Sequence, residues 1–222
     1  MSLPRAARRG LAEESADRIR DAIFNGHFPP GAPLREVELA RDLDVSRGSV
    51  REGLALLERE GLVHSAWHRG TTVIDVTPRD VEEVYTVRAA LDRLAALTAS
   101  AVADEDALTR LDLIAEAMSA EFDRGGPHLL ALDIAFHDAV YEAAGNSRLL
   151  QAWQAVRSQV YLFQLRRIAV DEQAYLTHVV GEHRELALLI RRNETGLLAR
   201  MAEEHVHSAR RALLAHLAKG NR

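Results

Sequence analysis

Four side chains in the C-terminal half of this sequence have the types and the spacing of a metal site. Asp133 and His137 are four residues apart, so their side chains converge if both lie on one helix. His183 and His205 each lie within an apolar stripe of a later predicted helix, and such a stripe faces the core. Buried imidazoles and carboxylates are costly to desolvate unless they have a partner. A divalent cation is such a partner, and nitrogen and oxygen ligands without sulfur favour Zn, Ni, Mn or Fe.

Each of these histidines alone would be explained as well by a core imidazole that is hydrogen-bonded to a neighbour. Neither an HxxxH motif nor a cysteine ligand supports the metal site, and only the four residues together favour it. A metal held by four protein ligands can keep positions open for water or a small carboxylate. Arg88 is a candidate clamp for that carboxylate, with a surface ion pair to Asp92 as the alternative. Asn146 is a second effector candidate, and a helix-end residue is its alternative.

A second polar group begins the helix predicted after Val45. Ser46 is a suitable N-cap, and Ser49 adds another hydroxyl near the helix N-terminus. Arg47 and Arg51 are four residues apart and share a face. Hydroxyls, free backbone N–H groups and two guanidinium groups at one helix N-terminus suit phosphates and base edges. A solvated amphipathic helix is the alternative interpretation.

The neighbouring segments favour DNA recognition. Helical patterning over residues 11–25 and 36–43 predicts two helices before this one, and the residues between them, 28–34, are predicted to be an extended connector. We expect the helix after Val45 to end at Gly61. Two β-rich runs follow within residues 62–76, and their turn contains His68, Arg69 and Gly70. The layout is that of a winged helix-turn-helix, whose wing tip could reach a minor groove. The alternative is a hairpin that only closes the core of a small domain.

The sequence after Thr77 predicts an all-α antiparallel bundle of about six helices. No strand pattern occurs there, and successive apolar stripes are separated by short breaks. The first stripe contains Val84, Val87, Leu91, Leu94 and Thr98, with Arg88 one position off it. We expect a DNA-binding domain over residues 1–76, a linker over 77–80, and a helical domain for ligand binding and dimerisation over 81–222.

Composition limits the possible classes of protein. The 222 residues are 47% hydrophobic and 27% charged, as in ordinary globular proteins. Cysteine is absent, which excludes disulfides, thiolate metal sites and cysteine nucleophiles. The net charge of −5 means that DNA contacts must come from local clusters of arginine. No apolar run approaches the roughly 20 residues of a membrane span, so we expect a cytoplasmic protein.

Several of these segments resemble a known family. Val45-Ser46-Arg47, Val50-Arg51-Glu52 and residues 57–63 resemble the DNA-binding domain of the GntR family of bacterial transcription regulators. In the helical half, four further segments resemble the FCD effector domain of its FadR subfamily. They are Val87-Arg88-Ala89-Ala90-Leu91, Asp133-Ile134-Ala135-Phe136-His137, Glu182-His183 and Glu204-His205.

The resemblance implies a homodimer that binds a palindromic operator through two winged helices. It implies DNA contacts by Ser46, Arg47 and Arg51, with Gly70 of the wing near the minor groove. It also implies that Asp133, His137, His183 and His205 are the ligands of a metal beside which a small organic acid binds. The chain departs from the family at Gly48-Ser49, where Thr-Pro or Thr-Thr is common, and this puts the operator sequence in doubt.

A second departure concerns the helix before the recognition helix. Some members have a DNA-contacting arginine where Val37 stands here, and Arg35, two residues earlier, is our candidate contact in that region. The predicted function is a transcription regulator, most simply a repressor, whose operator affinity is controlled by a small carboxylate at the metal site. The alternative is a metalloenzyme whose helical bundle carries an appended nucleic-acid-binding domain.

Overall fold

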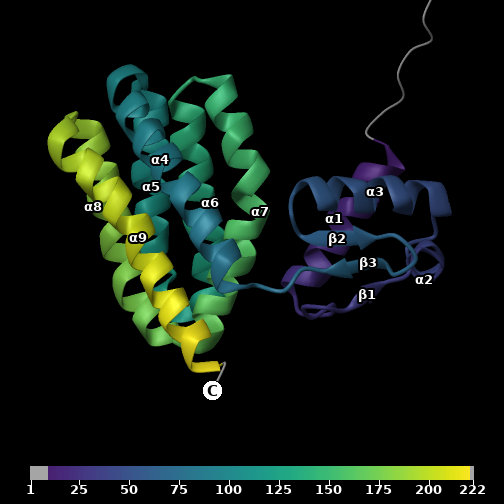
Figure 1. The fold of residues 1–222 in the computed structure, drawn as a ribbon. Helices are drawn as coiled ribbons and strands as arrows, with labels where there is room; N and C mark the ends of the chain where they lie inside the picture. The colour runs from purple at the N-terminus through teal and green to yellow at the C-terminus, as the bar shows by residue number, and fades with distance from the viewer. Residues whose placement is uncertain (1–9, 221–222) are drawn as a thin grey trace, which may run out of the picture. The chain divides into compact units, whose positions relative to one another are not determined.

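The computed structural model describes residues 10–220, which form two compact units (Figure 1). The first unit ends at Asp75 and the second begins at Val76. Each unit is described by itself below. Among the described residues, no helix is both long and apolar enough to cross a membrane.

The N-terminal unit is a winged helix-turn-helix, as predicted. Its three strands form an antiparallel sheet in the order β1-β3-β2. The connector that we expected to be only extended contributes the short strand β1, which pairs with β3. The elements of this unit are α1 (Leu11–Phe24), β1 (Pro33–Leu34), α2 (Glu36–Asp42), α3 (Arg47–Arg59), β2 (Val63–Ala66) and β3 (Gly70–Val73).

Local sequence explains where α3 begins and ends. The Ser46 hydroxyl accepts a hydrogen bond from the Ser49 backbone N–H at 3.1 Å, so it caps the first turn as predicted. Val50 and Leu57 are completely buried, which fixes the inward face of the helix against α1. Gly61 adopts a φ of +68°, the left-handed conformation that ends the segment. The face that carries Arg47 and Arg51 therefore points away from the core.

The wing is the hairpin of β2 and β3. The two strands pair in register from Val63↔Val73 to Ala66↔Gly70. The turn between them is tight because His68 and Gly70 both have positive φ, at +62° and +77°. The predicted tip residues therefore lie at the end of the hairpin.

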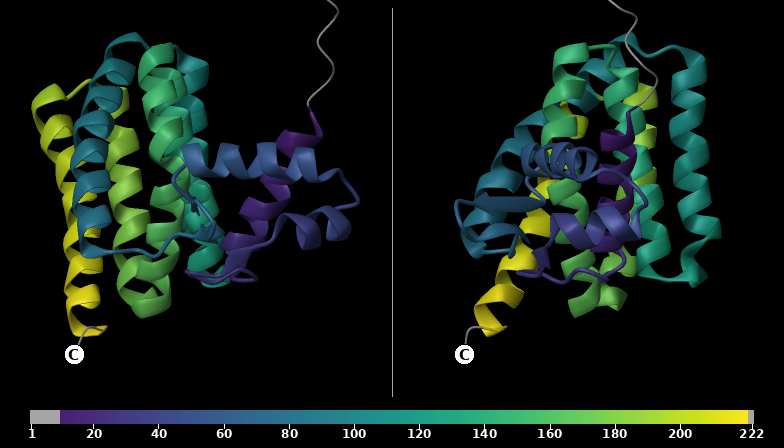
Figure 2. Two further views of the ribbon diagram at one scale, coloured as in Figure 1. Left: turned by 45° about the vertical axis from the view of Figure 1, so that its right-hand side comes forward. Right: turned by 90° about the vertical axis from the view of Figure 1, so that its right-hand side faces the viewer.

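The C-terminal unit is a helical bundle, which confirms the predicted fold class. Its long helices lie side by side in both views of Figure 2. A short 3₁₀ turn, Phe122–Arg124, connects two of them. The helices of the described residues are α4 (Pro78–Val102), α5 (Glu105–Ala120), α6 (Gly126–Ala143), α7 (Ser147–Val170), α8 (Glu172–Arg192) and α9 (Thr195–Gly220).

Helix α4 begins earlier than a linker over residues 77–80 would allow. The Thr77 side chain accepts a hydrogen bond from the Asp80 backbone N–H, and the Asp80 carboxylate accepts one from the Thr77 backbone N–H. Pro78 is the first helical residue, where its missing N–H costs nothing. The four residues are thus the cap and first turn of α4, and the extended connection lies over residues 74–77.

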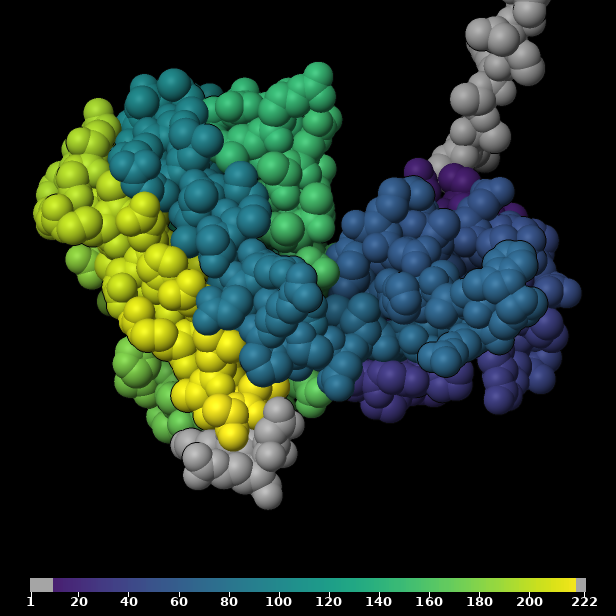
Figure 3. All heavy atoms as spheres, viewed as in Figure 1, coloured from purple at the N-terminus to yellow at the C-terminus, as the bar shows by residue number. Residues whose placement is uncertain are grey.

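The inward face of α4 is also rotated from the predicted stripe. Val87 and Leu94 are 50% and 49% exposed, whereas Arg88 and Asp92 are buried. The helix is rich in alanine, and small side chains let it pack closely along α9, which lies against it in Figure 3. Val84 of the predicted stripe is buried, so apolar spacing marked the buried face only in part.

A close backbone contact in the N-terminal unit gives a stability prediction. A Cβ on Gly53 would lie 2.9 Å from the Ala12 carbonyl oxygen and 3.1 Å from the Ala16 nitrogen. We expect Gly53→Ala to lower the free energy of unfolding by about 1–3 kcal/mol, because α1 must move away from α3.

Gly48→Ala is the matched control on the same helix. Its Cβ would meet only the Ser46 hydroxyl at 3.6 Å, so we expect unchanged or slightly greater stability. Calorimetric unfolding of the full chain measures both variants. Equal unfolding profiles for the Gly53 variant and the wild type would contradict the close contact.

Candidate metal centre and nucleic-acid interface

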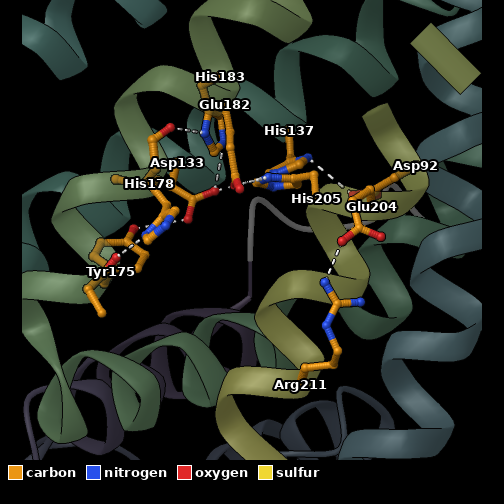
Figure 4. A network of polar contacts seen from close by, with 12 residues as sticks. Asp92, Asp133, His137, Tyr175, His178, Glu182, His183, Glu204, His205 and Arg211 are labelled. Carbon is orange, nitrogen blue, oxygen red and sulfur yellow. Dashed lines mark hydrogen bonds and ion pairs between the residues drawn. The ribbon is translucent and has the colours of Figure 1, made fainter. Parts of the chain in front are cut away.

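The structure brings the four predicted metal ligands together in the core of the bundle (Figure 4). One ligand atom from each residue lies within 4.8 Å of the others. Asp133 and His137 come from α6, His183 from α8 and His205 from α9, and none of these side chains is more than 5% exposed. Asp133 Oδ1 lies 3.1 Å from His183 Nε2 and 3.4 Å from His137 Nε2.

The outer nitrogens of two imidazoles are occupied by acceptors. His183 Nδ1 lies 2.7 Å from the Val179 carbonyl oxygen, and His205 Nδ1 lies 2.7 Å from a carboxylate oxygen of Glu182. In the neutral form of each ring the proton therefore sits on Nδ1, and the Nε2 lone pair then points to the centre.

This arrangement places acceptors against one another. His205 Nε2 lies 3.3 Å from His137 Nε2, and His183 Nε2 faces the Asp133 carboxylate. Either additional protons on the imidazoles or a cation at the centre relieves their repulsion. Three imidazole nitrogens and one carboxylate oxygen are the donor set of a divalent transition metal, so the residues present fit such an ion.

A second layer of polar side chains surrounds the four ligands. Arg88 donates through Nε to Asp92 at 3.2 Å, and its Nη2 lies 2.8 Å from His137 Nε2. Tyr141 donates to Asp92 at 2.6 Å. On the other side, Tyr175 donates to Asp133 Oδ2 at 3.0 Å. Hydrogen bonds from outside thus orient both carboxylates.

The ionisation of the site follows from burial and from these contacts. Burial alone would favour neutral Asp133, but His183 and His137 outweigh it and hold the pKa of Asp133 well below its usual value. Burial likewise opposes the charge of Asp92, yet Arg88 and His137 lower its pKa. Burial opposes the charge of Arg88 too, and Asp92 raises the pKa of that guanidinium. The site thus contains two carboxylates and one guanidinium in their charged forms.

A small cavity adjoins the cluster. It measures about 20 Å³, which is room for a single water molecule. Asp92, His137, Tyr141 and His205 supply its polar wall, and apolar side chains such as Phe136 and Leu186 supply the remainder. An organic acid needs more space than this, so one could enter only if side chains moved.

The two effector candidates have different positions. Arg88 is fully buried beside the cluster, and it makes the Asp92 ion pair in the core rather than at the surface. Asn146 is exposed, and its side-chain oxygen accepts hydrogen bonds from the backbone N–H groups of Arg148 and Leu149 as the N-cap of α7. The structure thus gives Asn146 the helix-end position that was the alternative to an effector contact.

The predicted recognition residues lie at the N-terminus of α3. Arg47 and Arg51 are 61% and 66% exposed. Both approach one carboxylate of α2: Arg51 donates twice to Glu36, at 3.0 and 2.8 Å, and Arg47 lies 3.5 Å from it. The Ser49 hydroxyl is 2.9 Å from that of Ser46. Guanidinium groups and hydroxyls are thus presented together on one exposed helix end.

The remaining DNA candidates are exposed but do not share one element. His68, Arg69 and Gly70 form the wing tip, and the Arg69 backbone N–H donates to the Ala66 carbonyl at 3.0 Å. Arg35 precedes α2 and pairs with Glu38 at 2.9 Å. Trp67, also at the tip, is 88% exposed.

Several side chains at these sites were not predicted from the sequence. Glu36 holds the two recognition arginines, and Glu182 holds His205, although it lies next to His183 in the sequence. The recurrence of Tyr85, Arg88 and Asp92 at helical spacing was a usable signal for the buried polar face of α4. The contacts of Glu36 and Glu182 link different helices, and no spacing along the chain indicates them.

Comparison with known proteins gives two family matches. Residues 83–208 match the family described as FCD domain, which spans more than half of the chain. Residues 11–73 match the family described as bacterial regulatory proteins, gntR family.

Individual relatives agree with these matches. A protein of Agrobacterium vitis, described as an uncharacterized HTH-type transcriptional regulator in the TAR-I ttuE-ttuC' intergenic region, is 37% identical over 62% of this chain and 82% of its own. A probable D-xylose utilization operon transcriptional repressor of Paenarthrobacter nicotinovorans is 34% identical over 70% of this chain and 69% of its own. The solved structure of E. coli McbR/YncC has a TM-score of 0.79 at 18% identity and covers 97% of this chain and 100% of that one, a likeness of fold.

The buried histidine cluster gives a prediction for the metal-free protein. Burial lowers the pKa of His205 from 6.5 to about 4, with His183 and His137 adding to the effect and Glu182 opposing it. Above pH 6.5 His205 is neutral in the folded and unfolded chains alike. As the pH falls below 6.5, the unfolded chain takes up the proton first, so stability is lost. We expect the free energy of unfolding to fall by about 2 kcal/mol between pH 7 and 5 from this group.

Urea unfolding of chelator-treated protein at pH 7, 6 and 5 measures this slope. His205→Gln should flatten it, whereas His178→Gln, which changes an exposed histidine, should not. Asp92, Asp133 and Glu182 have lowered pKa values, so their contribution is lost only below this pH range. An unaltered slope in the His205 variant would contradict the assignment.

Proposed function

We propose that this chain, which belongs to the GntR family of bacterial regulatory proteins and carries an FCD domain, binds a small organic acid beside a divalent metal and thereby controls its own affinity for DNA. It is a DNA-binding transcription regulator, and its family is not one of enzymes, so the metalloenzyme alternative is set aside. The observation that carries the proposal is the convergence of one ligand atom from each of three buried histidines and Asp133 within 4.8 Å in the bundle core.

The metal would be held by Asp133, His137, His183 and His205. Zn, Ni, Mn and Fe all suit this donor set. Positions that the protein leaves open would accept the carboxylate of an effector. The support comes from this chain's own hydrogen bonds: Val179 and Glu182 fix the ring protons of His183 and His205 on the outer nitrogens, so both rings are prepared for ligation through Nε2.

Arg88 is the residue that we assign to the effector carboxylate. Its Nη2 lies against His137 Nε2, the nitrogen that would bind the metal. Once that lone pair is used for ligation, Nη2 loses its acceptor and is available to another. A guanidinium is well suited to a carboxylate because its N–H groups match the two oxygens.

For the N-terminal unit we propose DNA contacts at two places. Ser46, Arg47, Ser49 and Arg51 would meet phosphates and base edges from the N-terminus of α3, in the manner of a recognition helix. The wing tip, with His68, Arg69 and Gly70, would approach the minor groove, and Arg35 would contact the backbone. Glu36 would release Arg47 and Arg51 to the DNA, since it holds both in the free protein.

We propose that the chain acts as a homodimeric repressor on a palindromic operator. Helix α4 supports the dimer because its outer face exposes Val87, Leu94 and Val102 at 49–60%, which is apolar surface that a second copy could cover. The same helix carries Arg88 and Asp92 on its inner face. An acid bound to Arg88 would therefore alter the helix that sets the pairing of two copies, and with it the spacing of two recognition helices.

The metal assignment is tested by elemental analysis of protein dialysed without chelator. We expect about one divalent metal ion per wild-type chain and a marked loss in His183→Ala, because one of four ligands is removed. His178→Ala is the matched control, since His178 is exposed on the same helix. Equal metal content in all three proteins would contradict the site.

The DNA assignment is tested by fluorescence anisotropy with a duplex that the wild type selects from a randomised pool. We expect Arg47→Ala and Arg51→Ala each to weaken binding about tenfold to a hundredfold, the loss of one base or phosphate clamp. Arg59→Ala, at the other end of α3, should bind normally. Normal affinity in both recognition-helix variants would rule out this face of α3.

A further inference from the structure

Two buried hydrogen-bond donors beside the metal centre have no partner. They are Arg88 Nη1 and Tyr85 Oη, and both side chains are completely buried. A buried donor without an acceptor costs stability, so native proteins contain few of them and each calls for an explanation. The hydrogen bonds of the metal-free bundle do not use these two groups.

The two donors are neighbours that the fold holds in place. Tyr85 and Arg88 lie three residues apart on α4, and the Arg88 guanidinium carbon is 5.8 Å from the centre of the Tyr85 ring. The Tyr85 ring stacks on Phe163 of α7, with centroids 6.1 Å apart and planes 10° from parallel. The other two guanidinium nitrogens of Arg88 face Asp92 and His137. Nη1 is thus the one nitrogen of Arg88 left for a further acceptor.

The charges of the centre indicate what that acceptor is. Asp92 accepts hydrogen bonds from Arg88 and Tyr141, and Asp133 accepts one from Tyr175, so the centre holds two carboxylates beside one guanidinium. Imidazoles bind a metal as neutral bases. Glu182 lies at the edge of the cluster, where it accepts a hydrogen bond from His205 Nδ1, and the positive charge of Arg167 is opposite in sign to its own. With a divalent metal and neutral imidazoles, the centre therefore has a net charge of +1. One buried positive charge in excess is costly unless one anion accompanies it.

We infer that Arg88 Nη1 and Tyr85 Oη bind the single carboxylate of a monocarboxylic acid, and that this site discriminates against dicarboxylic acids. The inference rests on the proposed function, because the excess charge arises only with the metal bound. A first carboxylate neutralises the centre and gives both donors an acceptor. A second buried carboxylate would have no counter-charge among these residues. Tyr85 is thereby a specificity residue of the effector site.

Matched pairs of acids test the charge rule. Lactate and malonate have three carbons each, and gluconate and glucarate have six each, and the members of each pair differ in the number of carboxylates. Titration calorimetry on metal-loaded wild-type protein should give binding by a monocarboxylate of at least one pair, and affinity at least about tenfold lower for its dicarboxylate. Equal or tighter binding of the dicarboxylates, or no binding of either monocarboxylate, would overturn the inference.

Tyr85→Phe tests the donor role. The variant keeps the ring on Phe163 and removes only the unpartnered hydroxyl. We expect its metal content to equal that of the wild type, its unfolding temperature to be unchanged or higher, and its affinity for the monocarboxylate to fall about tenfold. A purely structural role for Tyr85 predicts unchanged acid affinity, which would overturn the inference.

Two further outcomes distinguish a failure of this inference from a failure of the proposed function. Tyr175→Phe is the control among the buried tyrosines: its hydroxyl donates to Asp133, so we expect its loss to lower stability and metal content. A wild-type protein without metal overturns the proposed function and this inference together. This inference alone is overturned if the metal-loaded protein binds monocarboxylates and dicarboxylates with equal affinity and Tyr85→Phe does not change that affinity.

Discussion

The hydrogen bonds on the outer nitrogens of His183 and His205 determine the chemistry of the bundle. Because a backbone carbonyl and Glu182 accept those protons, the inner nitrogens face Asp133 and His137 as acceptors. Acceptors cannot be buried together without a cation or additional protons. The positions of α6, α8 and α9, the charge of Arg88 and the orientation of the tyrosine hydroxyls all accommodate that requirement.

The N-terminal unit handles charge in a different way. Its two recognition arginines are exposed, and in the free protein Glu36 satisfies both. DNA binding would thus exchange one anionic partner for another instead of neutralising unpaired cations. This suits a chain with a net charge of −5, since pairing limits attraction to polyanions in general while the arginines stay positioned for a specific site.

The sequence was enough to predict the fold class and to pick out four inward-facing metal candidates, which the structure places together. Both predictions follow because helical periodicity determines which face of a long helix is buried. The same reasoning failed on α4. There Val87 and Leu94 point outward, and the inner face contains Arg88 and Asp92 beside Val84, Tyr85 and several alanines. Arg88 and Asp92 pair with each other along α4, but their further partners, His137 and Tyr141, come from α6. Periodicity along one helix does not contain that information. The contacts of Glu36 and Glu182 were missed for the same reason.

Consecutive residues on α4, Val87 and Arg88, lie on different faces of the helix, one half exposed and one completely buried. Each residue of an α-helix rotates the chain by about 100° about the helix axis. The position of a residue along α4 therefore determines which face its side chain lies on. Insertion or deletion of one residue within it would carry the arginine out of the core and bring another side chain in. Gene variants that shift length should therefore be tolerated in the connection over residues 74–77 far better than inside α4, where only substitutions preserve both faces.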